Sequence, residues 1–295
     1  MSLAGSMSVF VHARQPLIAD SAARRIRRRI RTMGESGGKS AEQILKGFSV
    51  DDSWRLFRIT KHLGGVYATE RLIKMCNIAA GMYVLDIGCG TGYTACLLAE
   101  KHGARVVAAD INAELLEETR KRARRENVVD RVTTKEADAH SLPFLDNTFD
   151  VVIAESVLVF CDKVKAAKEI RRVLRPGGAF GDTEATYVKA PPADFAELMD
   201  LAARAPGGMM REDEWKAVYR EAGFDETSSV VRPLDTKEEF VSAIRVNGLK
   251  FLTSLFKALV DPKIRGTLIS GSSISVVRKG YSYMGYGLYV SRKSS

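Results

Sequence analysis

The sequence predicts an α/β protein with a doubly wound, mostly parallel sheet, because short apolar strands alternate with helical patterns. The clearest strand spans residues 82–87 and breaks into three alternating glycines, Gly88, Gly90 and Gly92, after which a helical pattern begins at once. A second apolar strand at residues 105–110 is followed by a charged helix. Strand, turn and helix repeated in this order are typical of βαβ units, whose strands lie parallel in one sheet.

The same periodicities predict the remaining elements in chain order. Before the first strand, helical patterns cover residues 51–63 and 68–76. After the second strand come a helix at 113–126, a strand at 131–136, a strand within 149–160 that ends at Glu155, a helix at 163–174, a strand ending at 181–184, a helix at 212–222, a strand near 228–232, helices at 237–246 and 249–260, and a last strand at 286–290.

Composition excludes several classes of protein. No apolar run of about 18 residues occurs, so we expect no membrane span. The four cysteines form no C-x-x-C pair and no cysteine–histidine cluster, so we expect neither a metal site nor a disulfide framework. The start of the chain also lacks the basic and apolar regions of a secretory signal. This pattern favours a cytoplasmic, reducing location.

The positive charge is concentrated near the N-terminus. The formal net charge is +9, and residues 1–39 hold eight basic and two acidic residues. Residues 21–33 form a predicted amphipathic helix whose arginines run from Arg24 to Arg31. This helix lies in a basic arm at residues 1–40. It is interpreted as a packing or lid helix with a solvated face, a docking surface for nucleic acid or an anionic substrate, or an organelle-targeting segment.

The glycine loop is suited to holding an anion. Glycine allows close approach of a ligand, and the first turn of the next helix carries unpaired N–H groups. Asp86 lies two residues before Gly88, and the spacing G-x-G-x-G differs from the dinucleotide fingerprint G-x-G-x-x-G. The combined pattern resembles the first motif of the class I methyltransferases that use S-adenosylmethionine (SAM). The resemblance implies that Gly88, Gly90 and Gly92 hold the methionine end of SAM and that Asp86 faces its ammonium.

The end of the second strand fits the same family. Asp110 follows Gly88 by 22 residues, close to the spacing of about 20 expected for an acid that accepts ribose hydroxyls. The next residue, Ile111, would pack on the adenine face. Because a nicotinamide cofactor also uses such an acid, Asp110 supports the fold more than the cofactor.

Two later motifs strengthen the resemblance. The segment EADAHSLPF, residues 136–144, resembles the family's third-strand motif, in which Asp138 would accept the adenine amino group and the Ala139 amide would meet a ring nitrogen. The segment LRPGG, residues 174–178, resembles the family's turn into the fifth strand. The neighbouring His140 is interpreted as a catalytic base, as a wall of the cofactor site or as a solvated loop histidine.

The segment HLGGVYAT, residues 62–69, resembles the glycine pair that precedes the first motif in phosphoethanolamine-type methyltransferases. Matched by position, Gly64, Gly65 and Thr69 would line the cofactor, and Tyr67 would lie near the substrate. The alternative interpretation is a simple break between two helices.

The carboxyl ends of the strands mark the expected reaction centre, because ligands of open α/β sheets bind there. Glu155 is interpreted as a base or substrate clamp, or as a structural acid of the cofactor loop. The candidates for a general base share a titratable side chain near this edge: His140, Glu155, Asp182, Glu184 and Tyr187. Glu184 and Tyr187 are also candidate substrate contacts.

The resemblance implies a Rossmann-like, seven-stranded sheet with an antiparallel last strand and a helical cap. The expected divisions are the basic arm at 1–40, a SAM-binding core with N-terminal helices at 41–184, a substrate-pocket insertion at 185–213 and a C-terminal part of the core at 214–295. The C-terminal part contains a helical insertion at 236–280.

The predicted function is methyl transfer from SAM to a small-molecule acceptor, with S-adenosylhomocysteine as the product. The first alternative is methylation of RNA or protein docked on Arg24–Arg31. The second is a SAM-binding module without catalysis, and the third is a nicotinamide oxidoreductase, which the glycine spacing and Asp138 disfavour.

Overall fold

A computed structural model of the chain describes residues 62–192, 196, 208–248, 253 and 282–294. All of these residues belong to one compact unit that spans 49–295. The predicted basic arm, residues 51–61 of the helix expected at 51–63, about half of the insertion at 185–213 and all but one residue of the helix expected at 249–260 lie outside the described residues. The proposed division boundaries remain predictions.

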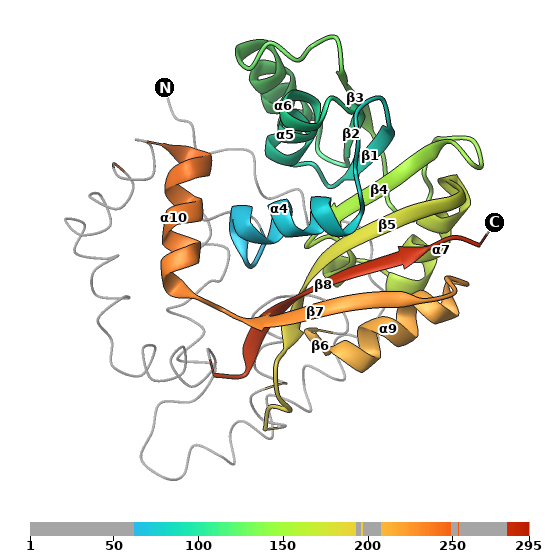
Figure 1. Cartoon of the computed structure of the whole chain (residues 1–295), viewed down its shortest axis with the longest axis vertical. Coiled ribbons are helices and arrows are strands. Elements are labelled where there is room, and N and C mark those ends of the chain that lie inside the picture. The colour runs from blue at the N-terminus through green and yellow to red at the C-terminus, as the bar shows by residue number, and fades with distance from the viewer. Residues whose placement is uncertain (1–61, 193–195, 197–207, 249–252, 254–281, 295) are drawn as a thin grey trace, which may run out of the picture. The chain divides into compact units, whose positions relative to one another are not determined.

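The predicted sheet is confirmed (Figure 1). Five strands pair in parallel in the order β3-β2-β1-β4-β5, and β8 then runs antiparallel to both β5 and β7. The strands are β1 (Tyr83–Ile87), β2 (Arg105–Asp110), β3 (Val132–Glu136), β4 (Phe149–Glu155), β5 (Leu174–Tyr187), β7 (Thr227–Pro233) and β8 (Met284–Arg292). An eighth strand, β6 (Met210–Arg211), was not expected, because two residues leave no periodic signal; it pairs with the end of β5.

Helices cover both faces of the sheet because successive strand residues point to opposite sides. Val84 packs in one apolar core with α4, α5 and α6, whereas its neighbour Leu85 packs in a second core with α7 and α9. The helices are α4 (Gly65–Met75), α5 (Tyr93–His102), α6 (Ala113–Arg125), α7 (Lys163–Val173), α9 (Glu212–Glu221) and α10 (Thr236–Asn247). None of the helices in the described part of the chain is long and apolar enough to cross a membrane.

The L-R-P-G-G segment forms a bulge rather than a separate turn before the strand. Leu174 pairs with Phe149, and Ala179 is the next residue to pair, with Val151. The four residues between them leave the ladder, and Gly177 takes a positive φ of 75° there. The strand β5 also continues to Tyr187, beyond its expected end at Glu184.

The helix α10 caps the N-terminus of α4. The cap residue of α4, Gly64, has a left-handed backbone and provides no side-chain cap. The Gly64 N–H donates to Glu239 Oε1 over 2.5 Å, and the Val66 N–H donates to Ser242 Oγ over 3.2 Å. The helical insertion therefore satisfies two of the free donors that every helix start leaves.

Candidate functional site

The glycine loop joins β1 to α5 and needs glycine at all three positions. Gly88, Gly90 and Gly92 have φ values of 64°, 56° and 77°, a left-handed region that other residues enter only at a cost. Gly92 is also the cap residue of α5, which begins with no side-chain cap among its donors. The first turn of α5 therefore has no side-chain cap from Gly92, and a helix start of this kind suits a ligand anion.

The helix α6 holds this loop from behind, which the sequence motifs did not indicate. Thr119 Oγ1 donates to the Gly90 carbonyl over 3.0 Å, and Arg122 Nε donates to the Thr91 carbonyl over 3.0 Å. Thr119 is fully buried, and it is the only uncharged polar residue in the sequence of α6. This feature of the sequence could have indicated its role. These two hydrogen bonds tie the carbonyls of the loop to α6.

Asp110 reaches the same loop from the end of β2. Its Oδ2 accepts from the Gly90 N–H and its Oδ1 from the Asn112 N–H, each over 2.9 Å. Each carboxylate oxygen retains a second lone pair for a hydroxyl group. The next side chain, Ile111, is 57% exposed, which is unusual for isoleucine and suits contact with an aromatic ring.

Asp86 is a buried carboxylate without a complete set of partners. Its side chain is 2% exposed, and its Oδ2 has no hydrogen-bond partner among the described residues. Burial raises the pKa of Asp86 well above its ordinary range, and the carboxylates of Glu155 and Asp110 raise it further. A bound cation would relieve this repulsion, so the residues present fit the ammonium of SAM.

Glu155 joins two helices at the end of β4. Its Oε1 accepts from Thr69 of α4 over 2.7 Å, and its Oε2 accepts from Thr94 of α5 over 2.5 Å. The structure therefore brings together Thr69 and Glu155, both predicted, and adds Thr94, which no motif indicated.

The other residues of the glycine pair segment are set by packing. A Cβ on Gly64 would lie 2.7 Å from the Tyr286 ring, so the close approach of α4 to β8 explains this glycine without a cofactor. The half-buried ring of Tyr67 lies 5.4 Å from the Arg245 guanidinium of α10. Tyr67 therefore faces the helical insertion.

His140 contacts Asp138 through its backbone N–H and its Nδ1, and its Nε2 contacts the segment before α7. Asp138 Oδ1 accepts from the His140 N–H over 2.9 Å and from Nδ1 over 2.7 Å, while His140 Nε2 accepts from the Asp162 N–H over 2.9 Å. Partial burial raises the pKa of Asp138, but the hydrogen bonds from His140 outweigh it, and the pKa lies below its usual value. Since both ring nitrogens are engaged by neighbouring loop groups, this geometry disfavours His140 as a catalytic base. Ala139 between them is buried.

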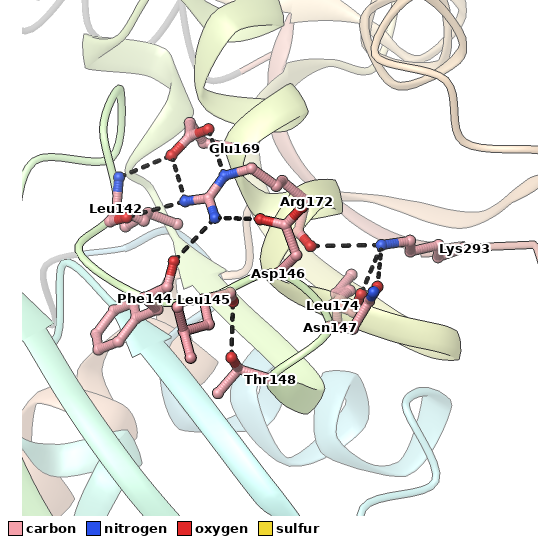
Figure 2. Close-up of polar contacts among 10 residues, drawn as sticks. All are labelled: Leu142, Phe144, Leu145, Asp146, Asn147, Thr148, Glu169, Arg172, Leu174 and Lys293. Atoms are coloured by element: carbon pink, nitrogen blue, oxygen red, sulfur yellow. Dashed lines mark hydrogen bonds and ion pairs between the residues drawn. The ribbon is translucent and has the colours of Figure 1, made fainter.

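An arginine of α7 holds the loop that follows Asp138 and His140 (Figure 2). The Arg172 guanidinium donates to the carbonyls of Leu142 and Phe144 over 2.9 and 2.8 Å, and to Asp146 over 2.7 Å. Glu169 accepts from Arg172 and also from the Leu142 N–H over 2.9 Å. These long-range contacts were not predictable from the sequence motifs.

Replacing Arg172 with lysine is expected to lower the free energy of unfolding by about 1–2 kcal/mol, since one ammonium cannot reach the acceptors that the planar fork spans. Urea denaturation measures this loss. The matched control is Arg175→Lys, because Arg175 makes a single exposed contact with Asp150. Equal stability of Arg172→Lys and the wild-type protein would contradict the assignment.

Three candidates on β5 lie in the interior. Asp182 and Glu184 are 0% exposed and Tyr187 is 6% exposed. Glu184 Oε1 accepts from the backbone N–H groups of residues 157–159 over 2.9, 2.7 and 3.3 Å, and Asp182 accepts from the Tyr219 hydroxyl over 2.8 Å. The contacts of Glu184 stabilise the turn η2 (Leu158–Phe160), which is a structural role.

The buried position of Glu184 predicts a pH dependence of stability. Burial raises the pKa of Glu184 to about 7, against its ordinary value of 4.5, although three backbone hydrogen bonds lower it. Between these values the folded state keeps a proton that the unfolded state has lost, so stability falls as the pH rises through this range. Glu184→Gln should remove most of this loss, on the order of 2 kcal/mol.

Denaturation at pH 5.5 and 7.5 checks this result. Glu212→Gln is the control. Hydrogen bonds from Lys216 and Ser229 lower the pKa of Glu212 in the folded state, and its ordinary value of 4.5 already lies below pH 5.5, so Glu212 binds no proton in either state across the window. An undiminished loss of stability in Glu184→Gln would refute the expectation.

Comparisons with known proteins agree with this geometry. A family model described as a methyltransferase domain matches residues 85–181. The 27-O-demethylrifamycin SV methyltransferase of Amycolatopsis mediterranei is 34% identical over 218 residues, which cover 71% of this chain and 76% of that protein. The methyltransferase GfsG of Streptomyces halstedii is 44% identical over 115 residues, covering 39% of this chain and 41% of GfsG, so the chain spans less than half of that relative.

A solved structure shares the fold. Phosphoethanolamine N-methyltransferase 2 of Haemonchus contortus, in complex with SAM, superposes with a TM-score of 0.66 at 19% identity, over 90% of this chain and 60% of that one. No group of three or more metal-ligating side chains occurs among the residues that the structure describes. With a relative above 30% identity aligned along most of both proteins, the chain belongs to the class I methyltransferases, whose cofactor is S-adenosylmethionine.

Proposed function

We propose that the chain transfers the methyl group of SAM to an oxygen of a small-molecule acceptor. The observation that carries this proposal is the similarity to the Amycolatopsis mediterranei enzyme, which is named for 27-O-demethylrifamycin SV and aligns over 71% of this chain. The helix α10, which contacts α4 beside the proposed cofactor site, supports an enclosed pocket over an open docking surface.

SAM supplies a methyl group on a positively charged sulfur. The residues of the chain bind and orient it. The glycine loop and the first turn of α5 would bind the carboxylate of SAM, and Asp86 would bind its ammonium. Asp110 would bind the ribose, and Asp138 and the Ala139 amide would bind the adenine. Because His140 uses both ring nitrogens internally and Glu155 accepts two hydroxyl hydrogens, we propose that rate enhancement comes chiefly from holding the acceptor in line with the methyl group.

The test is incubation of the full chain with SAM carrying a labelled methyl group and a panel of hydroxylated small molecules, followed by mass spectrometry. We expect one labelled product that is absent with the Asp110→Ala variant. Labelled RNA or protein, lost on deletion of residues 1–33, would instead support docking on Arg24–Arg31. Tight SAM binding without any labelled product would support the non-catalytic module.

A further inference from the structure

A buried histidine lies in the site, and neither the sequence motifs nor the comparisons assign it a role. His62 is 9% exposed and precedes the start of α4. Its Nε2 lies 3.3 Å from Thr69 Oγ1 and 3.7 Å from Glu155 Oε1. His62 therefore contacts the same hydroxyl that joins α4 to the carboxylate at the end of β4.

The hydrogen bonds determine which atom donates. An ionised carboxylate only accepts, so Thr69 gives its one hydroxyl hydrogen to Glu155 over 2.7 Å. The other acceptor within reach, the Gly65 carbonyl, is 3.4 Å away. The Thr69 oxygen must then accept from the imidazole, which assigns the hydrogen to Nε2 of His62. Donation runs from His62 to Thr69 to Glu155.

The end of this chain of hydrogen bonds lies beside the glycine loop. In the register of β1 with β4, Ile87 pairs with Ala154, so Glu155 is level with Gly88. The second oxygen of Glu155 accepts from Thr94 in the first turn of α5. The carboxylate is thus fixed next to the place where the loop receives the methionine end of SAM.

We propose that His62 is a positioning residue for the cofactor: through the Thr69 hydroxyl it holds the Glu155 carboxylate toward the ammonium group at the methionine end of SAM. A carboxylate held by two hydroxyl groups loses little side-chain freedom when the cofactor binds, which strengthens binding. The inference rests on SAM as the cofactor and not on the identity of the acceptor, so it is separate from the proposed substrate class.

Two matched substitutions test the position of the donor. The amide nitrogen of glutamine lies as many bonds from Cβ as Nε2 of histidine, whereas that of asparagine corresponds to Nδ1. Isothermal titration of the full chain with SAM should show an affinity for His62→Gln within about threefold of wild type. His62→Asn and His62→Leu should each lose about tenfold. Equal affinities of the glutamine and asparagine variants would overturn the proposal.

A double-mutant cycle tests whether His62 acts through Thr69. Thr69→Val removes the hydroxyl at nearly constant volume and should weaken SAM binding about tenfold. His62→Leu combined with Thr69→Val should be little worse than either single variant. Independent losses that multiply to about a hundredfold would show that His62 serves packing alone and would overturn the proposal. If His62→Leu fails to fold, the cycle is run with His62→Asn. Because only SAM binding is measured, failure here leaves the proposed acceptor class untouched.

Discussion

Replacing Gly90 with valine is expected to abolish SAM binding. Gly90 has a φ of 56°, which a β-branched residue enters only with strain. Its N–H donates to Asp110 and its carbonyl accepts from Thr119, so any shift of this residue disturbs both partners. A branched side chain would also occupy space on the face of the loop that we propose contacts the cofactor. Calorimetry should show an affinity at least a hundredfold weaker than that of the wild-type protein.

The matched control for this prediction is Gly177→Val. Gly177 has a φ of 75° and no atom lies within 4 Å of the position that a Cβ would take. It lies in the bulge of β5 next to Leu174, which pairs with Phe149 at the start of β4, the edge of the sheet opposite the loop. This variant carries similar backbone strain and should retain SAM affinity. A wild-type affinity for Gly90→Val would show that the loop does not hold the cofactor.

Asp110→Ala is expected to weaken SAM binding about a hundredfold. The substitution removes the carboxylate proposed to accept the ribose hydroxyls, and charge-assisted hydrogen bonds contribute about 1.5–3 kcal/mol each. It also removes the acceptor for the N–H groups of Gly90 and Asn112, which loosens the glycine loop. Calorimetry with SAM measures the effect, and a hundredfold corresponds to about 2.7 kcal/mol.

Asp150→Ala is the control, because it also removes a carboxylate that accepts a hydrogen bond from a backbone N–H. Asp150 accepts from the Tyr83 N–H over 2.7 Å, but at the amino ends of β1 and β4. Its replacement should lower stability and leave SAM affinity within about twofold. Unchanged affinity for Asp110→Ala would refute the ribose placement.

Local patterns explain why most elements could be predicted. Strands such as residues 105–110 and helices such as residues 113–125 follow from the period of their apolar side chains, which is a property of neighbours in the chain. The glycine loop could be located for the same reason, since a positive φ at Gly88, Gly90 and Gly92 is a local requirement. The short strand β6 and the bulge in β5 depend on pairing with distant strands and gave no local signal.

The site residues divide in the same way. Asp86 and Asp110 could be named from their place at the ends of two strands, and the fold brings both to the glycine loop, where Asp110 contacts Gly90. Glu184 and Asp182 were candidates on the same reasoning, but the interior of the fold engages them instead. A strand-end acid can face a ligand or a neighbouring backbone, and only the packing around it decides which.

The sequence by itself predicted the family, the order of the strands and helices apart from β6 and η2, and the acids and glycines of the proposed cofactor site, because these follow from the periodicity of each segment and the spacing between motifs. Only the tertiary structure decided which side chains hold those groups in place. Thr69 and Glu155 are 86 residues apart, and Gly64 and Glu239 are 175 apart. Such partners come into contact only when the sheet and its helices have packed, so no local pattern in the sequence can predict them.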